Sequence, residues 1–261
     1  MHVIGSQLAT TWAASQPVLT RYKLLEIERI AIAKLSEEGI TMTLSGRITS
    51  APDGALGFDT NTSISLAVAQ QFRGDGFRFC LRYLSLGAGQ QAGDLTTAEA
   101  NHILDGGLTL MPVQHVRRAG WQATGDLGTS TGLHAANNAQ SVGFPPGVNV
   151  WMDLEGVSVA SSAADVIAYC NNWFEQVHAA GYVPGIYVGF DARLSSHQLF
   201  QNLKFQHYWK AGGNIPPIER RGYQMIQTIG NPPEHLHGIE IDRYTTQTDQ
   251  LGGKALWLIR P

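Results

Sequence analysis

Eight short apolar runs alternate with helical stretches from residue 55 onward, and this alternation constrains the fold more than any other feature. Several runs are apolar at nearly every position, which is typical of strands buried on both faces of a parallel sheet. Strands that alternate with helices in this way predict an α/β fold, a compact (β/α)8 TIM-like barrel, with an open doubly wound sheet as the alternative. The runs are Ala55–Asp59, Phe77–Leu84, Leu108–His115, Val148–Leu154, Val183–Val188, Phe205–Trp209, Tyr223–Thr228 and Ile239–Asp242.

Two of the predicted helices have recognisable signals. Thr96 and Glu99 have the spacing of a capping box and open a helix that extends to Asp105. The longest helical stretch covers residues 161–180, and its apolar residues form one wide face.

Residues 1–54 differ from the rest of the chain, so we expect an N-terminal extension, 1–54, and a barrel domain, 55–261. Apolar residues recur at steps of three and four between Thr20 and Glu38, which predicts an amphipathic helix that ends near Gly39. A turn-forming Ser-Ala-Pro-Asp-Gly segment at 50–54 marks the boundary. The extension either docks on the barrel or acts as an adaptor or delivery module.

Composition excludes several classes of protein. Hydrophobic residues make up 43% of the chain, enough for a sizeable core and too many for a disordered protein. The net charge is −3, and basic residues never form a run longer than two arginines, which argues against nucleic acid or an anionic membrane as partner. No stretch is typical of a membrane span, and residues 1–20 lack the pattern of a secretory signal.

The residue types that hold metals and cofactors are not arranged in known motifs. We expect Cys80 and Cys170 to be small buried side chains rather than a disulfide framework. His235 and His237 lie in a Pro-rich loop, and no Cys-x-x-Cys or His-Glu-x-x-His occurs. The chain also lacks a Gly-x-Gly-x-x-Gly after a strand and the Gly-x-Ser-x-Gly of serine hydrolases. We therefore expect no metal and no cofactor.

Carboxylates close three of the apolar runs, at the strand ends where barrels carry their catalytic groups. These are Asp59 in the first run, Asp153 and Glu155 in the fourth, and Asp242 in the eighth. Residues i and i+2 of a strand share a face, so Asp153 and Glu155 should both face the mouth. Their proximity should raise one pKa, and acid/base catalysis needs one protonated and one ionised group. Glu155, nearer the strand end, is the predicted proton donor; helix capping or pairing with arginine is the alternative.

Several side chains near the predicted strand ends can bind a polar ligand that has apolar ring faces. Aromatic rings can stack on such a face, and Tyr187 is the strongest candidate. His115 and Gln114 end the third run and can form hydrogen bonds to a hydroxyl group of such a ligand. The predicted substrate-binding set is Tyr187, Tyr83, Arg82, Gln114, Trp151 and Gln227, and further aromatic candidates are Trp121, Trp209 and Tyr244.

Four short segments follow one another along the chain: Gly57-Phe58-Asp59, Asp153-Leu154-Glu155, Gly185-Ile186-Tyr187-Val188-Gly189 and Ile241-Asp242. In this order and spacing they resemble the family 25 glycoside hydrolases, the lysozyme-type muramidases of phages, bacteria and fungi. The chain also contains Arg82-Tyr83-Leu84, and with this segment it is even more similar to a related family, the bacterial glycoside-hydrolase-like domain of unknown function. The resemblance covers roughly residues 55–250.

This resemblance implies an irregular (β/α) barrel with an acidic groove at its mouth. It also implies cleavage of the β-1,4 bond between N-acetylmuramic acid and N-acetylglucosamine in peptidoglycan. By position, Glu155 matches the acid/base of the muramidases, and Asp59, Asp153 and Asp242 match the other active-site carboxylates. The muramidases usually carry Trp-Gln-Tyr on a late strand, where this chain has residues 223–228, and the missing aromatic residue would alter a sugar subsite.

The sequence therefore predicts a glycosidase of the bacterial cell wall, secreted or periplasmic, with an antibacterial effector as one form. The expected partner is peptidoglycan or a related glycan, and a secretion machinery and an immunity protein are further hypothetical partners. The alternative function is a non-catalytic barrel that binds glycan or a protein.

Overall fold

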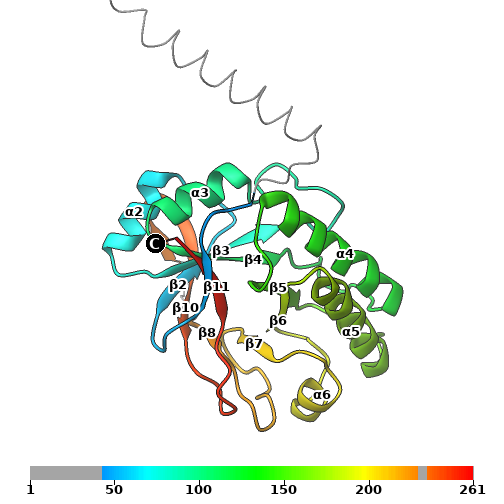
Figure 1. Ribbon diagram of the computed structural model, residues 1–261. Coiled ribbons are helices and arrows are strands. Elements are labelled where there is room, and N and C mark those ends of the chain that lie inside the picture. Colours follow the sequence, from blue (N-terminus) through cyan, green and yellow to red (C-terminus); the bar gives the residue numbers. More distant parts are fainter. Residues whose placement is uncertain (1–42, 229–233, 261) are drawn as a thin grey trace, which may run out of the picture. The chain divides into compact units, whose positions relative to one another are not determined.

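The structure, a computed structural model, describes residues 43–228 and 234–260. Eight strands close into a barrel, and each of the eight apolar runs forms one of them, so the predicted barrel is confirmed (Figure 1). The helix expected between Thr20 and Glu38 lies outside the described residues. The barrel strands are β2 (Leu56–Asp59), β3 (Phe79–Leu84), β4 (Thr109–Gln114), β5 (Asn149–Leu154), β6 (Val183–Val188), β7 (His207–Lys210), β8 (Met225–Thr228) and β10 (Ile239–Thr246).

One barrel strand runs against the others. The pairs from β2 through β8 are parallel, and β4 pairs with β5, whereas β10 is antiparallel to both β2 and β8. From its place at the end of its run we expected Asp242 at the rim, with Glu240 either deeper or paired with a basic side chain. The strand direction behind this expectation is wrong, whereas Glu240 Oε2 does lie 3.5 Å from His235 Nε2. Asp242 lies near the mouth because β10 starts there, and Glu240 lies further out and is exposed. The short strand β9 (Glu234–Leu236) pairs with this outer part of β10.

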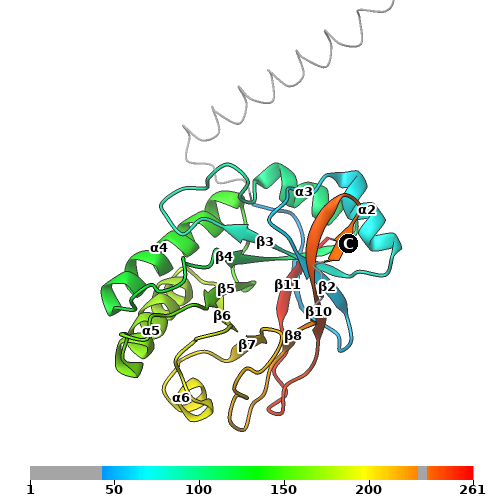
Figure 2. The ribbon, with the colours of Figure 1, turned by 180° about the vertical axis from the view of Figure 1, so that it is seen from behind.

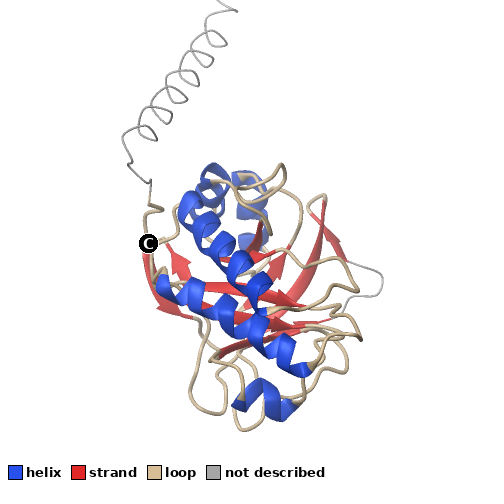
Figure 3. Cartoon of the chain, turned by 90° about the vertical axis from the view of Figure 1, so that its right-hand side faces the viewer, coloured by secondary structure: helices blue, strands red, loops and turns tan. Residues whose placement is uncertain are grey.

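Helices cover the barrel unevenly, which agrees with the irregular barrel that the family resemblance implies. Figure 2 shows them beside β2 to β7, with α2 also near the outer end of β10, whereas none of the described helices lies against β8. The long helices α4 and α5 lie side by side (Figure 3), and a Cβ at Gly132 of α4 would come within 2.7 Å of Cα of Trp173 in α5. The described helices are α2 (Leu66–Gly74), α3 (Thr97–Asp105), α4 (Gly125–Val142), α5 (Ala163–Ala179) and α6 (Ser196–Gln201).

The start of α3 shows only half of the predicted capping box. The Thr96 hydroxyl accepts a hydrogen bond from the Glu99 backbone N–H at 3.1 Å. The Glu99 carboxylate does not return to Thr96, because it accepts hydrogen bonds from Arg82 and from the Ile64 backbone N–H. The helix therefore begins at the predicted residue, while the Glu99 side chain bonds to Arg82 of β3 instead of capping the helix.

Two further strands extend the sheet outside the barrel. Strand β1 (Arg47–Ser50) pairs antiparallel with β11 (Leu256–Ile259), and Leu258 of β11 pairs with Leu110 of β4. Residues 47–50, which precede the expected boundary at residue 54, thus pair with the C-terminal end of the barrel unit. Both cysteines are buried and free, as expected.

Large side chains fill the inside of the barrel beneath its mouth. A Cβ at Gly57 would overlap with the ring of Phe79, and one at Gly185 with the ring of Trp151. The Trp209 ring meets those of Trp151 and Tyr244 edge to face, with centroids 5.9 and 4.8 Å apart. This filled interior places the next inward-facing residues at the C-terminal strand ends. None of the described helices is long and apolar enough to span a membrane.

Candidate active site

Asp59, at the end of β2, is held by two tyrosines from neighbouring strands. Its Oδ2 accepts hydrogen bonds from the Tyr83 hydroxyl at 3.1 Å and the Tyr244 hydroxyl at 2.6 Å. Only 6% of Asp59 is exposed. Burial raises the pKa of Asp59 to about 7, the charge of Asp242 adds to this rise, and the tyrosine hydroxyls oppose it.

Asp153, on β5, is the deeper member of the Asp153–Glu155 pair. It lies level with Tyr187 of β6, and its Oδ1 is buried without a hydrogen-bond partner among the described residues. Burial, followed by the charges of Glu155 and Asp59, raises the pKa of Asp153 well above its usual range. The environment therefore favours the neutral acid, since an unpaired charge would be costly at this depth.

Glu155 lies just beyond β5 and is half-buried. Burial raises the pKa of Glu155, the charges of Asp191 and Asp242 add to the rise, and a hydrogen bond from the Phe190 backbone N–H opposes it. Its side chain packs on Gly189, where an added Cβ would lie 2.7 Å from the Glu155 Cβ and would overlap with Oε2. A residue without a side chain at 189 thus makes room for the Glu155 carboxyl.

Asp242 and Tyr187 complete the group through Gln227. The Tyr187 hydroxyl donates a hydrogen bond to Gln227 Oε1 at 2.8 Å. Burial raises the pKa of Asp242, while a hydrogen bond from the Gln227 side chain lowers it. The charges of Asp59, Asp153, Glu155 and Asp242 all act on the Tyr187 hydroxyl and, after burial, raise its pKa. The structure thus brings the four predicted carboxylates together around Tyr187.

The sequence profile of the Rv2525c-like, glycoside hydrolase-like domain matches residues 70–253. This chain belongs to the Rv2525c-like glycoside hydrolase-like family. The predicted resemblance to the glycoside-hydrolase-like domain related to family 25 is therefore confirmed. Among curated proteins, no sequence matches the chain significantly.

Solved structures share the fold at low sequence identity. The Tat-secreted protein Rv2525c of Mycobacterium tuberculosis, in complex with L-tartrate, is 14% identical with a TM-score of 0.55, over 77% of this chain and 98% of that one. The catalytic domain of endolysin ply40 from bacteriophage P40 of Listeria monocytogenes is 16% identical with a TM-score of 0.54, over 76% and 95%. A family 25 glycosyl hydrolase from Bacillus anthracis is 12% identical with a TM-score of 0.50, over 76% and 94%.

Three residues of the predicted substrate-binding set lie away from the mouth of this glycoside hydrolase-like barrel. Arg82 is fully buried on the outside of β3, where Nε lies 2.6 Å from Glu99 Oε1 and a guanidinium N–H donates to the Thr60 carbonyl. Gln114 donates to the Ser85 and Thr131 carbonyls and accepts from the Trp173 indole. Trp151 fills the barrel beneath Asp153. We therefore assign these three side chains to the scaffold.

The remaining aromatic candidates divide between the core and the rim. Trp209 and Tyr244 are buried inside the barrel. At the rim, the His115 ring stacks on Tyr83 with centroids 4.5 Å apart, and the Trp121 indole donates to the Glu155 carbonyl at 2.8 Å. Tyr83, His115 and Trp121 therefore border the carboxylates.

Two site residues that contact Glu155 were missed in the sequence. Gly189 closes the Gly185–Gly189 motif, so its position after a strand was the available signal. Phe190 follows it in a loop, and nothing in a single sequence marks a backbone N–H that holds a distant carboxyl. Asp191, whose charge also acts on Glu155, belongs to the same loop.

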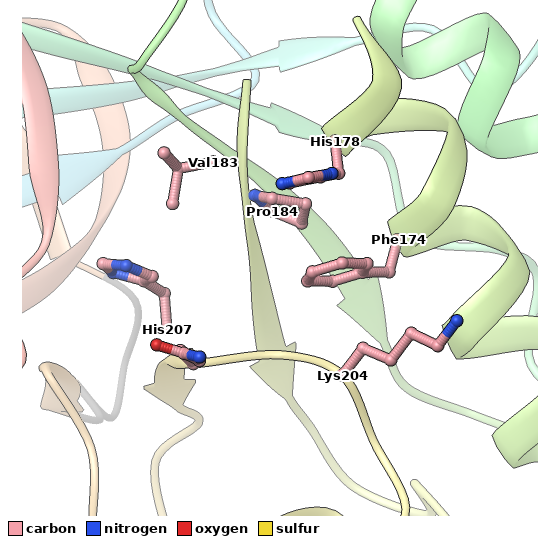
Figure 4. Close-up of a pocket in the computed structure, with 7 residues that line it drawn as sticks. Phe174, His178, Val183, Pro184, Lys204 and His207 are labelled. Atoms are coloured by element: carbon pink, nitrogen blue, oxygen red, sulfur yellow. The ribbon is translucent and has the colours of Figure 1, made fainter. Parts of the chain in front are cut away.

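A hollow of about 240 Å³ lies at the other end of the barrel. It is lined by the first residues of β6 and β7 and by the end of α5, including Pro184, His207, Phe174 and His178 (Figure 4). No carboxylate lines it, and it is separate from the candidate active site. Within residues 43–228 and 234–260, no three His, Cys, Asp or Glu side chains are grouped so that they could hold a metal ion.

Proposed function

We propose that this protein is a glycosidase that cleaves the glycan strand of bacterial peptidoglycan in the manner of a muramidase, with Glu155 as general acid. The observation that carries the proposal is the position of Glu155, a half-buried acid of raised pKa above the more deeply buried Asp153. Glycosidases need one carboxyl that stays protonated near neutral pH to deliver a proton to the leaving oxygen.

The other groups have complementary roles in this proposal. Asp153, whose Oδ1 has no partner in the described chain, stabilises the positive charge that develops on the sugar or orients its N-acetyl group. Asp59 and Asp242 bind substrate and orient water, and Asp242 also helps keep Glu155 protonated. Tyr187 and Gln227 form the wall that holds Asp242 in place.

The same proposal places the protein outside the cytoplasm, at the cell wall. A Tat-secreted protein and an endolysin among the structures of similar fold support this location. Residues 1–54 would then serve a dedicated secretion machinery, and an antibacterial effector of this kind would be matched by an immunity protein. Deletion of residues 1–42, which leaves β1 paired with β11, tests the first point: if export is unchanged, the segment has no delivery role.

Digestion of purified peptidoglycan sacculi tests the activity itself. Muropeptides released by the protein are reduced with borohydride and separated by mass. New reducing ends on N-acetylmuramic acid are the expected result, and reducing ends on N-acetylglucosamine would assign the other glycosidic bond. Sacculi that bind the protein but stay intact would instead favour the non-catalytic, glycan-binding alternative.

A further inference from the structure

We propose that the loop between β6 and α6 forms a second sugar subsite beside Glu155, with the Phe190 ring as the surface on which the sugar stacks. The inference rests on the glycan substrate of the proposed function and adds a binding position to it. Its ligand is a neighbouring amino-sugar unit of the same glycan strand.

A hollow of suitable size lies against this loop. It measures about 360 Å³ and is lined by residues 189–194 and by residues 214–216 of the segment between β7 and β8. Ligand sites in proteins usually measure about 300–1,000 Å³. Gly189 and Phe190, which line the hollow, both contact the Glu155 side chain. A sugar bound there would therefore lie next to the proposed proton donor.

Phe190 offers the apolar surface that a sugar ring needs. It is 50% exposed, and it is the one aromatic residue among the exposed large apolar side chains of the described chain. Sugars present an apolar face of C–H groups, and the flat apolar face of an aromatic ring can pack against such a face. Because Phe190 lines the hollow next to the Glu155 carboxyl, its exposed ring is placed to contact a ligand that binds there.

Polar groups of the same loop border this ring. The Arg193 guanidinium lies 3.1 Å from Asp191 Oδ1, and its Nε donates to the Val157 carbonyl at 3.2 Å. With Asn214 on the facing segment, the hollow presents a carboxylate, a guanidinium and an amide. These are the donors and acceptors that can bind the hydroxyl and N-acetyl groups of an amino sugar.

The loop is held in an uncommon conformation. Asp191 and Arg193 have φ values of 57° and 59°, in the left-handed region that residues other than glycine rarely adopt. Backbone hydrogen bonds from Gly156 to Phe190 at 2.9 Å and from Val157 to Asp191 at 3.2 Å tie the loop to the segment after β5. Strained loops that are fixed in this way cluster at ligand sites, and here the fixed position is next to Glu155.

Binding of N-acetylglucosamine oligomers tests the subsite. Titration calorimetry with oligomers of two to six sugars is carried out on Glu155→Gln protein, so that no probe is cleaved. We expect affinity to rise with oligomer length, Phe190→Ala to weaken binding of the longer oligomers about three- to tenfold, and Phe190→Trp to retain it. The backbone N–H that holds residue 155 is present in all three forms. Leu251→Ala, an exposed apolar residue at the opposite end of the barrel, is the matched control and should change nothing.

Hydrolysis of sacculi by the same substitutions in active protein separates the two proposals. If Phe190→Ala binds every oligomer and digests sacculi as well as the wild type, the subsite is wrong and the proposed function stands. If the wild type leaves sacculi intact while Phe190→Ala still weakens oligomer binding, the subsite stands and the hydrolase proposal fails. If the protein neither binds oligomers nor cleaves sacculi, both proposals fail.

Discussion

Asp59 and Asp242 lie directly opposite each other in the ladder between β2 and β10. This pairing exists because β10 runs antiparallel to its neighbours and begins at the mouth of the barrel. Two carboxylates on directly paired residues, one of them buried, repel each other when both are ionised. The charge of Asp242 accordingly contributes to the raised pKa of Asp59.

Asp59 should make the stability of the protein depend on pH. Its folded-state pKa of about 7 lies above the value of 3.8 expected in the unfolded chain, so folding favours the protonated form. The stabilisation is therefore fully present below about pH 4 and is lost as the pH rises through about 7. We expect Asp59→Asn to gain stability relative to the wild type between pH 4 and pH 8, by up to about 4 kcal/mol. Urea denaturation across this range measures the difference, with the exposed Asp126→Asn as control; parallel curves for Asp59→Asn and wild type would contradict the prediction.

The pH–rate profile should respond to two neighbours of Glu155. The charges of Asp191 and Asp242 raise the pKa of Glu155, so Asp191→Asn and Asp242→Asn should each lower it. A general acid works only when protonated, and the basic limb of the profile should therefore move to lower pH. Asp153 and Glu155, whose proximity we expected to raise one pKa, are coupled as well, since the charge of Glu155 raises the pKa of Asp153. A basic limb that stays in place in both variants would show that Glu155 is not the titrating acid.

Gly189 should be required for activity and not for folding. In Gly189→Ala the new Cβ would overlap with Glu155 Oε2, and the carboxyl must move. Displacement of a catalytic group by about 1 Å can lower the rate about 100-fold, and a loss of that order is expected in kcat. Gly74→Ala is the control, because a Cβ at Gly74 meets no atom within 4 Å. Activity within threefold of wild type in Gly189→Ala would contradict the packing of Glu155 on this residue.

Arg82 and Glu99 should contribute to the stability of the fold and not to catalysis. The pair is buried, and removal of one partner leaves the other charge uncompensated, which usually costs about 3–5 kcal/mol. We expect Glu99→Gln to lower the free energy of unfolding by that amount and to leave the pH–rate profile of the folded protein unchanged. The exposed pair of Lys204 and Glu175 gives the comparison, since Glu175→Gln should cost less than about 1 kcal/mol. A shifted pH–rate profile in Glu99→Gln would show that Arg82 does have a role in the active site.

The barrel could be predicted from the sequence because each of its strands is an apolar run bounded by polar residues. The direction of β10 could not, because alternation of side chains along a strand reads the same in both directions. The strands β1, β9 and β11 are three or four residues long and lie outside the barrel. Strands β1 and β11 pair with partners far away in the chain, which no local pattern reveals, whereas β9 forms a short hairpin with the adjacent β10.

The same alternation explains which site residues were misplaced. On β3, Tyr83 faces Asp59 inside the barrel, so its neighbour Arg82 must face outward to α3. Gln114 likewise faces α4 and α5. Trp151 does share the face of Asp153. However, it comes two residues earlier on β5 and therefore lies below the mouth of the barrel. Strand parity therefore could have excluded Arg82, whereas the depth of Trp151 required the structure.

Comparison of wild type with Glu155→Gln on peptidoglycan sacculi tests whether Glu155 is the general acid of a muramidase. The amide keeps the shape of the side chain but has no proton to transfer, so the release of reducing ends should fall about 10²–10⁴-fold while thermal unfolding is unchanged. Glu175→Gln, the same change at an exposed position on α5, should digest sacculi as the wild type does. We expect muramic acid reducing ends from wild type and Glu175→Gln and almost none from Glu155→Gln. Equal release from all three proteins would contradict the assignment of Glu155 as the general acid.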